Sequence, residues 1–345
     1  MDSGRLDELQ ACRDAAAVAA LYGPLGAEAR GAFLITGASS GFGLETALAL
    51  ARSGATVVMA CRPGAKAEAA VERVRVAAAA ASGDVYLLPL DLAEPASVRA
   101  CAAAYESLRP RLPRGGALAA LVLNAGVIGV PFGAYADGED SQLRVNLLGH
   151  ALLHELLRPA LDANSAETRV VVVSSGSNWW LSARKELDLA RELPPRRDNF
   201  DFGHSYCFSN VCRILWARAL ARRVDYPVVS LHPACSQTDI GASFGRLPLL
   251  SILSALCSIL PRAAWYEGRS SLEGQSAAQG ARTQTFVATA PRATVEPLSG
   301  KFLSGNETNG PLGRPVAPCA VAQRDDYADV VLAFADTFVR RELLR

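Results

Sequence analysis

The sequence predicts an α/β fold built on a single doubly wound parallel sheet, with helices on both of its faces. Two observations carry this prediction. Short, uninterrupted apolar runs recur along the chain, as in strands that are buried on both sides. Between these runs lie longer segments rich in alanine and leucine, which suit the helices that connect one parallel strand to the next.

Six apolar runs are the predicted strands. In chain order they read AFLIT from Ala32, TVVMA from Thr56, VYLLP from Val85, ALVLN from Ala120, RVVVV from Arg169 and VVSLH from Val228. The segments LETALALARSG (44–54) and PASVRACAAAYESL (95–108) are long enough, and rich enough in good helix formers, to be crossover helices. Regular alternation of strand and helix places the strands parallel in one sheet.

Composition bounds the class of protein. The chain has 345 residues, and 50% of them are hydrophobic, which allows an extensive core. A net charge of +1 gives no basic surface for nucleic acid, so we expect a small-molecule partner. The first thirty residues include several acids and no apolar run, which argues against a signal or transit peptide and favours a cytoplasmic protein.

Neither the cysteines nor the longest apolar segment indicates a disulfide, a metal site or a membrane span. The eight cysteines contain no CxxC pair, as expected of reduced thiols. Cys207 and Cys212 would face different sides of one helix, so they and His204 make a poor metal site. The segment LPLLSILSALCSILP (247–261) is too short to span a bilayer. We expect a buried or lid helix there, and peripheral contact with a membrane stays open.

A glycine-rich segment, TGASSGFG (36–43), follows the first predicted strand and opens the first predicted helix. At such a position a turn can aim backbone N–H groups at a pyrophosphate. A tight turn without a ligand is the alternative, but strand, turn and helix together favour a cofactor. The residues expected to contact this cofactor are Gly37, Ser39, Ser40, Gly41, Phe42 and Gly43.

Two residues at the ends of the second and third strands bear on which cofactor binds. Arg62 stands where an acid would usually hold the adenosine ribose of NAD. A guanidinium there can pair with a 2′-phosphate, which favours NADP, although a solvated arginine is the alternative. Asp91 either contacts the adenine or serves as an acid at the start of the next helix.

The stretch HSYCFSN (204–210) places a tyrosine and an asparagine four residues apart on a predicted helix. Residues at this spacing share a face, so Tyr206 and Asn210 offer a phenol and an amide to the same place. Taken alone, the stretch suits a core tyrosine equally well. The rest of the pattern has to decide between the two readings.

Six motifs in order make that pattern. They are TGASSGFG (36–43), LDL (90–92), LNAG (123–126), VNLLGH (145–150), VVVSSGS (171–177) and Tyr206. In these motifs the chain resembles the short-chain dehydrogenases/reductases. Its later segments HPACSQT (232–238), SAAQGARTQTFVATAP (276–291) and SGKF (299–302) are similar to the retinol-dehydrogenase-like branch. The resemblance implies a Rossmann-type NADP-binding domain over 31–310, an N-terminal helical extension (1–30) and a C-terminal tail with a helix (311–345).

The resemblance also implies roles for single residues. Ser175 would polarise a substrate carbonyl and Tyr206 would transfer the proton, while Asn146 would hold a water on the proton path. Ser174 competes with Ser175, and the motif favours Ser175. The implied cofactor contacts beyond the glycine turn are Arg62, Asp91, Leu92, Asn124, Ala125, Gly126, Tyr206, Asn210, Pro233 and Thr238. The longer segment after Ser175, with Trp179 and Trp180, is expected to form a substrate wall.

The main departure from the family is Asn210, which stands where the family has a lysine. An amide can still bond the nicotinamide ribose, but it cannot supply the charge that lowers the pKa of the tyrosine. Loss of a nearby cation typically raises a pKa by ~1 to 3 units. We therefore expect Tyr206 to be a poor base and a usable acid, which favours reduction. Arg213, seven residues after Tyr206, is expected to lie too far along the helix to replace the lysine.

The predicted function is NADP(H)-dependent reduction of a lipophilic carbonyl, a retinal-like aldehyde or a steroid-like ketone, with a tyrosine proton donor. The alternative is a catalytically weak or silent NADP-binding protein that acts as a sensor or interaction partner. A weaker resemblance is to light-dependent protochlorophyllide reductases, which also use the lysine. The oligomeric state stays open.

Overall fold

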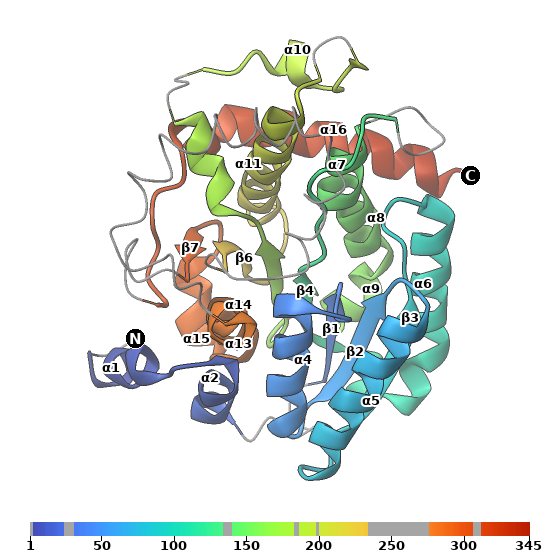
Figure 1. Ribbon diagram of the computed structural model, residues 1–345, viewed down its shortest axis with the longest axis vertical. Coiled ribbons are helices and arrows are strands. Elements are labelled where there is room, and N and C mark those ends of the chain that lie inside the picture. Colours follow the sequence, from blue (N-terminus) through green and yellow to red (C-terminus); the bar gives the residue numbers. More distant parts are fainter. Residues whose placement is uncertain are drawn as a thin grey trace.

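A computed structural model describes residues 3–23, 31–133, 140–182, 186–197, 200–233, 276–305 and 312–345. A parallel sheet lies at its centre (Figure 1). Within the described residues this sheet has 7 strands in the order β3-β2-β1-β4-β5-β6-β7. They are β1 (Ala32–Thr36), β2 (Thr56–Cys61), β3 (Val85–Pro89), β4 (Leu118–Leu123), β5 (Val170–Val173), β6 (Val228–His232) and β7 (Phe302–Ser304).

The six predicted strands and the doubly wound parallel sheet are confirmed. The prediction missed β7, because three residues are too few to stand out as an apolar run. This strand pairs in parallel with β6, and its neighbour in the tail, Pro315, bridges to Leu303. Every strand pairing in the sheet is parallel, so all carboxyl ends lie at one edge.

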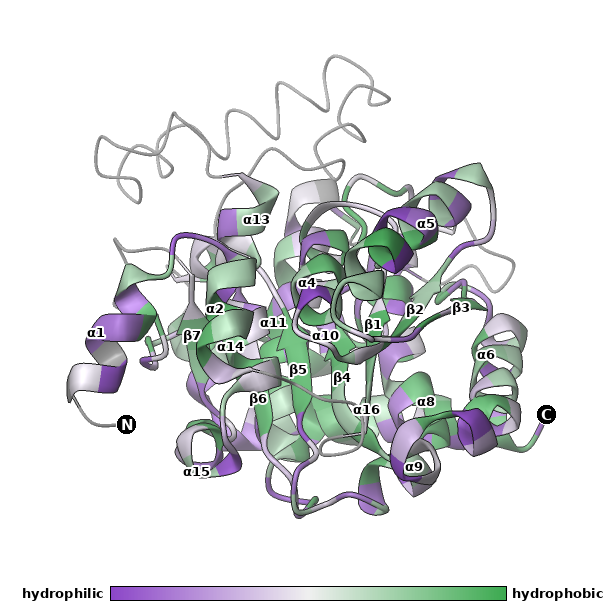
Figure 2. Cartoon of the chain, turned by 90° about the horizontal axis from the view of Figure 1, so that it is seen from below, coloured by the Kyte–Doolittle hydropathy of each residue, from purple (hydrophilic) through white to green (hydrophobic). Residues whose placement is uncertain are grey.

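Helices cover both faces of the sheet, and the strand side chains alternate between them. On β1, for example, Leu34 packs into one apolar cluster, and Phe33 and Ile35 pack into the other. The first cluster includes α6 (Pro95–Leu108), α8 (Gly149–Leu156), α9 (Arg158–Asp162), α11 (Phe202–Leu220) and α16 (Asp325–Leu343). The second includes α2 (Ala15–Tyr22), α4 (Gly41–Arg52), α5 (Ala65–Ala79) and α14 (Arg282–Thr289). Figure 2 shows the apolar strands β4, β5 and β6 between these layers.

Short helices complete the described chain. The α-helices among them are α1 (Ser3–Ala11), α7 (Ser141–Leu143), α10 (Leu189–Glu192), α13 (Ala277–Gly280) and α15 (Arg292–Val295). A π-helical stretch, Arg144–Leu148, joins α7 to α8. The 3₁₀ helices are Arg109–Arg111, Pro113–Gly116, Gly176–Leu181, Glu296–Leu298 and Ala320–Gln323.

Both terminal segments pack on the domain. Helix α2 lies against α4 and α14, and Asp14 caps it by accepting the Ala17 N–H at 2.9 Å. Helix α16 lies across α11 (Figure 1) and contacts α8 as well. Ion pairs such as Arg218–Asp325, at 2.7 Å, join α16 to α11. The C-terminal helix therefore braces the helix that carries Tyr206.

The part of the chain that the structure describes contains no helix with the length and hydropathy needed to cross a bilayer. The predicted lid segment 247–261 and Thr238 lie outside the described residues.

Candidate active site

The order of the strands reverses between β1 and β4, and a parallel α/β sheet binds ligands at such a point. Thr36, at the end of β1, ties the two strands together. Its hydroxyl oxygen accepts the N–H groups of Asn124 and Ala125, at 2.9 and 3.0 Å. The side chain of Asn124 returns a bond to the Thr36 carbonyl, at 2.9 Å. The loop after β4 is therefore held rigidly beside the glycine turn.

The glycine turn runs from the end of β1 into α4, and its glycines have different physical roles. Gly37 has a φ of +67°, and a Cβ there would lie 2.9 Å from the Ala125 backbone. Gly43 is a packing residue, since its Cβ would lie 2.5 Å from the Asn124 amide nitrogen. At the start of α4 the side chain of Ser40 makes no capping bond. The first N–H groups of a 12-residue helix are thus left for an anion.

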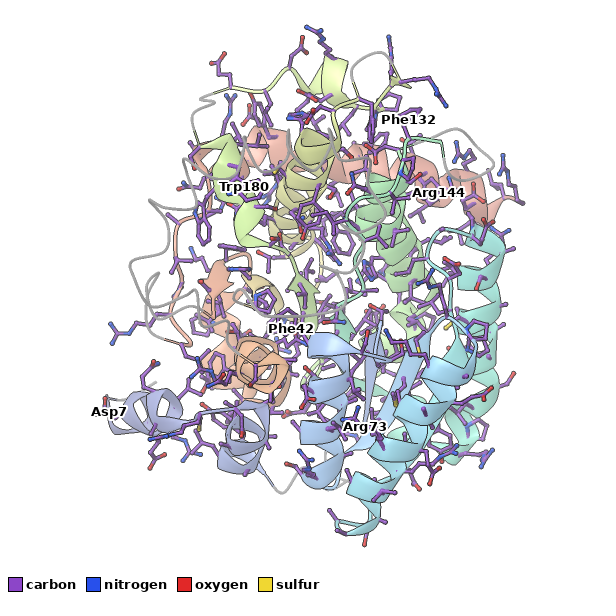
Figure 3. The ribbon with its side chains drawn as sticks, in the orientation of Figure 1. Asp7, Phe42, Arg73, Phe132, Arg144 and Trp180 are labelled. Atoms are coloured by element: carbon purple, nitrogen blue, oxygen red, sulfur yellow. The ribbon has the colours of Figure 1, made fainter. Side chains whose placement is uncertain are left out.

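An open cavity of about 650 Å³ lies in front of this turn. Most of the predicted cofactor residues line it: Gly37, Ser39, Ser40, Gly41, Phe42, Arg62, Asp91, Leu92, Asn124, Ala125 and Gly126. Gly43, Tyr206, Asn210 and Pro233 do not line it. The ring of Phe42, at the start of α4 (Figure 3), packs against Gly280 of α13, where a Cβ would lie 2.2 Å from it.

The sequence reasoning missed Lys66, which also lines this cavity. It lies four residues after Arg62, in the first turn of α5, so the segment CRPGAK could have indicated it. Arg62 is exposed at the cavity wall. An uncapped helix start and two cationic side chains around one cavity fit a phosphorylated dinucleotide.

Asp91 does two things. Its Oδ1 accepts the Ala93 N–H at 3.0 Å, in the turn before α6, whose N-cap residue is Glu94. Asp91 also lines the cavity, next to Leu92. A contact between Asp91 and the adenine stays a prediction.

Ser175 and Tyr206 come together at the carboxyl edge of the sheet. Asp201 caps α11 by accepting the His204 N–H at 2.7 Å, and this sets the start of the helix that presents Tyr206. Ser175 follows β5, and its hydroxyl accepts the Ser177 N–H at 3.1 Å. Burial raises the pKa of the Tyr206 phenol, against the lowering effect of hydrogen bonding with Ser175, of the Arg213 charge and of Asn210. The phenol is therefore protonated at neutral pH.

Ser174 points away from this pair. It is buried, and its hydroxyl donates to the backbone carbonyl of Asn210 at 2.9 Å. Alternation along β5 thus turns Ser174 into the protein and leaves Ser175 half-buried at the site.

Asn210 and Asn146 are both buried in hydrogen-bond networks. The Asn210 amide donates to the backbone carbonyl of Tyr206 at 3.0 Å. Asn146 lies in the π-helical stretch, and its side chain clamps Val127 by accepting its N–H at 2.8 Å and donating to its carbonyl at 3.1 Å. It also donates to the Ser209 hydroxyl at 3.0 Å. Asn146 therefore fixes the loop after Gly126 to α11.

Arg213 connects α11 to the loop after β4. Its guanidinium reaches from α11 to the end of β4, where Nη2 donates to the Ala125 carbonyl at 2.6 Å and the Leu123 carbonyl at 3.3 Å. Its charge is among the influences that lower the pKa of Tyr206. The expectation that Arg213 lies too far along the helix to replace the lysine is therefore reconsidered under the further inference below.

Trp179 differs from expectation, and for Trp180 the role in a substrate wall stays a prediction. Trp179 is a core residue: its indole donates to the Ala317 carbonyl at 3.0 Å, and its ring packs edge-on against His232 and Phe302. It anchors the tail to the sheet instead of forming a substrate wall. Trp180, labelled in Figure 3, is half-buried beside it.

Known proteins support the class that this geometry indicates. The model of the short chain dehydrogenase family matches residues 32–179. Mouse retinol dehydrogenase 14 is 35% identical over 282 residues, which cover 78% of this chain and 76% of that protein. Bovine retinol dehydrogenase 12 is 34% identical over 275 residues, covering 79% and 76%. The chain therefore belongs to the short-chain dehydrogenase/reductase family, a class of nicotinamide-dependent oxidoreductases. Within it, the chain falls in the retinol-dehydrogenase-like branch.

Solved structures agree on the fold. A putative uncharacterized protein from Mycobacterium paratuberculosis superposes with a TM-score of 0.61 at 26% identity, over 93% of this chain and 97% of that one. The NADPH-bound carbonyl reductase from chicken fatty liver has a TM-score of 0.53 at 22% identity, over 81% and 97%. At this level of identity the second match shows the fold alone.

Proposed function

We propose that this protein is an NADP(H)-dependent reductase of a lipophilic carbonyl, with Tyr206 as the proton donor. The observation that carries the proposal is the Tyr206 phenol beside the Ser175 hydroxyl, at the carboxyl edge of the sheet, where the glycine turn that lines the dinucleotide cavity also lies. Burial raises the pKa of this phenol. A reductase needs a phenol that holds its proton until the substrate oxygen becomes basic.

The residues divide the work as follows. Ser175 donates a hydrogen bond to the carbonyl oxygen, and Tyr206 gives that oxygen its proton. Asn210 and Asn146 hold α11 and the loop after β4 in register. When bound, the cofactor supplies the hydride. Polar groups fixed before the reaction stabilise the charge that develops on the oxygen.

The preference for NADP(H) is supported by Arg62 and Lys66 at the cavity, which offer positive charge to a 2′-phosphate. The substrate class is inferred from the relatives named retinol dehydrogenases. An apolar polyene aldehyde such as retinal is therefore the first compound to test, followed by steroid ketones. A cytoplasmic location stays a prediction.

A second function, a silent NADP-binding protein, is favoured by one observation. Asn210 carries no charge, and its side-chain amide donates a hydrogen bond to the backbone carbonyl of Tyr206. Tyr206 then lacks the lysine of the family at its usual place.

The test is to mix purified protein with NADPH and a panel of hydrophobic aldehydes and ketones, and to follow loss of NADPH absorbance. Carbonyl-dependent consumption that disappears in Tyr206→Phe supports the reductase. Tight NADPH binding without consumption on any carbonyl of the panel would favour the silent binder.

A further inference from the structure

We propose that Arg213 supplies, from one position on α11, the positive charge that the family lysine supplies from another, and so stabilises the phenolate of Tyr206. This inference deepens the proposed function, because it explains how Tyr206 can return to its ionised form during turnover. Arg213 acts through Tyr206, and we assign it no contact with substrate.

The first step is the position of the guanidinium. Arg213 is 4% exposed. A Cβ on Gly126 would lie 3.4 Å from Nη1 of Arg213 and 3.5 Å from Oδ1 of Asn146. The charge therefore lies between the loop that lines the dinucleotide cavity and the Asn146 clamp, on the side of α11 that faces the sheet.

The second step is the lack of an anionic partner. Within the described residues no carboxylate lies within ion-pair distance of Arg213, and its Nε has no hydrogen-bond partner. The oxygen atoms that accept its hydrogen bonds are the backbone carbonyls of Leu123 and Ala125. Burial lowers the pKa of Arg213 to about 10, and the charge of Tyr206 opposes this change. A buried cation held only by dipoles favours a nearby group that can become an anion. Tyr206 lies two turns before Arg213 on the same face of α11, and Ser209, which the Asn146 clamp holds, donates to the backbone carbonyl of Tyr206 at 2.9 Å.

The third step excludes His150 as the source of charge. Thr36 accepts two backbone N–H groups, and its own hydroxyl can donate to Nε2 of His150 at 2.9 Å or to the Val122 carbonyl at 3.4 Å. The shorter distance favours donation to His150. The other nitrogen, Nδ1, then donates to the Asn146 carbonyl at 3.1 Å. Both hydrogens of Arg213 Nη2 go to carbonyls, which leaves its 3.2 Å approach to Nδ1 a contact between donors. Burial and the Arg213 charge hold the pKa of His150 well below its ordinary value.

The other titratable groups around α11 are either neutral or bonded to other residues. Burial lowers the pKa of His232, on β6, to about 4, and raises that of Cys207 to about 12. Arg144 (Figure 3) turns toward α16, donating to the Ala93 carbonyl at 2.7 Å. The remaining pairs are Asp140 with Ser205, Glu192 with His204, and Asp325, Asp329 and Asp336 with arginines of α11 and the turn after it. Burial raises the pKa of Cys212 as well.

The test measures the ionisation of residue 206 in the protein without cofactor or substrate. A fluorinated tyrosine, whose phenol is more acidic, replaces Tyr206 alone, and its ¹⁹F signal is followed against pH. Arg213→Gln should raise its pKa by about one unit or more. Arg213→Lys, which keeps the charge, should give a smaller rise. Arg282→Gln is the matched control, since Arg282 is also buried and donates to backbone carbonyls far from the site; it should change nothing.

Moving the cation gives the sharper result. The double variant Asn210→Lys with Arg213→Gln should bring the pKa back to the unsubstituted value or below, which a purely structural role for Arg213 does not predict. If Arg213→Gln alone does not fold, the comparison is made between Asn210→Lys and that double variant, where loss of Arg213 should still raise the pKa. An unchanged titration in folded protein overturns the proposal. Because the readout needs no turnover, an inactive protein with the expected shift would refute only the proposed function.

Discussion

The side-chain amide of Asn210 donates to the backbone carbonyl of Tyr206, 3.0 Å away on the preceding turn of α11. Asn210 is 1% exposed, so this bond is made in the protein interior. The residue that stands in the place of the family lysine thus holds the helix and brings no charge. Burial, which raises the pKa of the phenol, then leaves Tyr206 protonated at neutral pH.

A lysine at position 210 should change the pH dependence of catalysis. At a given pH the equilibrium constant fixes the ratio of kcat/KM in the two directions, so the effect appears as a shift in the pH profiles. Alcohol oxidation needs the phenolate, and its kcat/KM should rise at a pH lower by about one unit or more in Asn210→Lys. Asn210→Met introduces a side chain close in size to lysine but without charge. It should leave the inflection of the pH profile where it is in the unsubstituted protein. An unmoved inflection in the lysine variant would contradict this assignment of Tyr206.

Alanine substitution of the two serines after β5 should affect kcat very differently. Ser175→Ala removes a donor to the carbonyl oxygen and should lower kcat by ~100-fold or more. It also removes the bond to the Ser177 N–H, which should cost about 1 kcal/mol of stability. Ser174→Ala removes a buried bond to the Asn210 carbonyl and should cost about 1 kcal/mol of stability while leaving kcat within a few-fold. Steady-state kinetics and denaturant unfolding of both variants check this. A large loss of kcat in Ser174→Ala, with kcat preserved in Ser175→Ala, would make Ser174 the catalytic serine.

Arg62 should carry much of the preference for NADPH. Hydrogen bonds to charged groups contribute about 1.5 to 3 kcal/mol, so Arg62→Ala should weaken NADPH binding ~10- to 150-fold. NADH binding should change little. Arg73→Ala is the control, because Arg73 (Figure 3) is exposed on α5 outside the cavity. Calorimetry with both cofactors decides, and equal losses for NADPH and NADH would remove Arg62 from this role.

Buried histidines should make the protein sensitive to acid. Burial lowers the pKa of His154 to about 3 and that of His232 to about 4, below the value near 6.5 expected in the unfolded chain. The unfolded state then binds more protons below pH 6.5, so stability present above that pH is lost as pH falls. From pH 7 to 5 each histidine should cost about 2 kcal/mol. His154→Asn should flatten the measured fall in unfolding free energy by that amount; an equal slope would argue against a neutral, buried His154.

The sequence predicted the parts of this protein that local patterns determine. Apolar runs predicted six strands, and the segment 36–43 predicted the turn that lines the cavity. Strand β7 was not predicted, because its three residues form a strand through their pairing with β6. The bond of Arg213 to the Ala125 carbonyl and that of the Trp179 indole to the Ala317 carbonyl were not predicted, because they depend on tertiary contacts that spacing does not encode.

The most direct test of Tyr206 as the proton donor of a reductase is a single turnover with deuterated cofactor. Enzyme in excess is mixed with retinal and NADPH that carries deuterium at the transferable position, and the alcohol is analysed by mass spectrometry. This detects even a slow reaction that absorbance would miss. The account predicts deuterium at the former carbonyl carbon with the unsubstituted protein and almost none with Tyr206→Phe, although both bind NADPH. Equal labelling by the two proteins would contradict it.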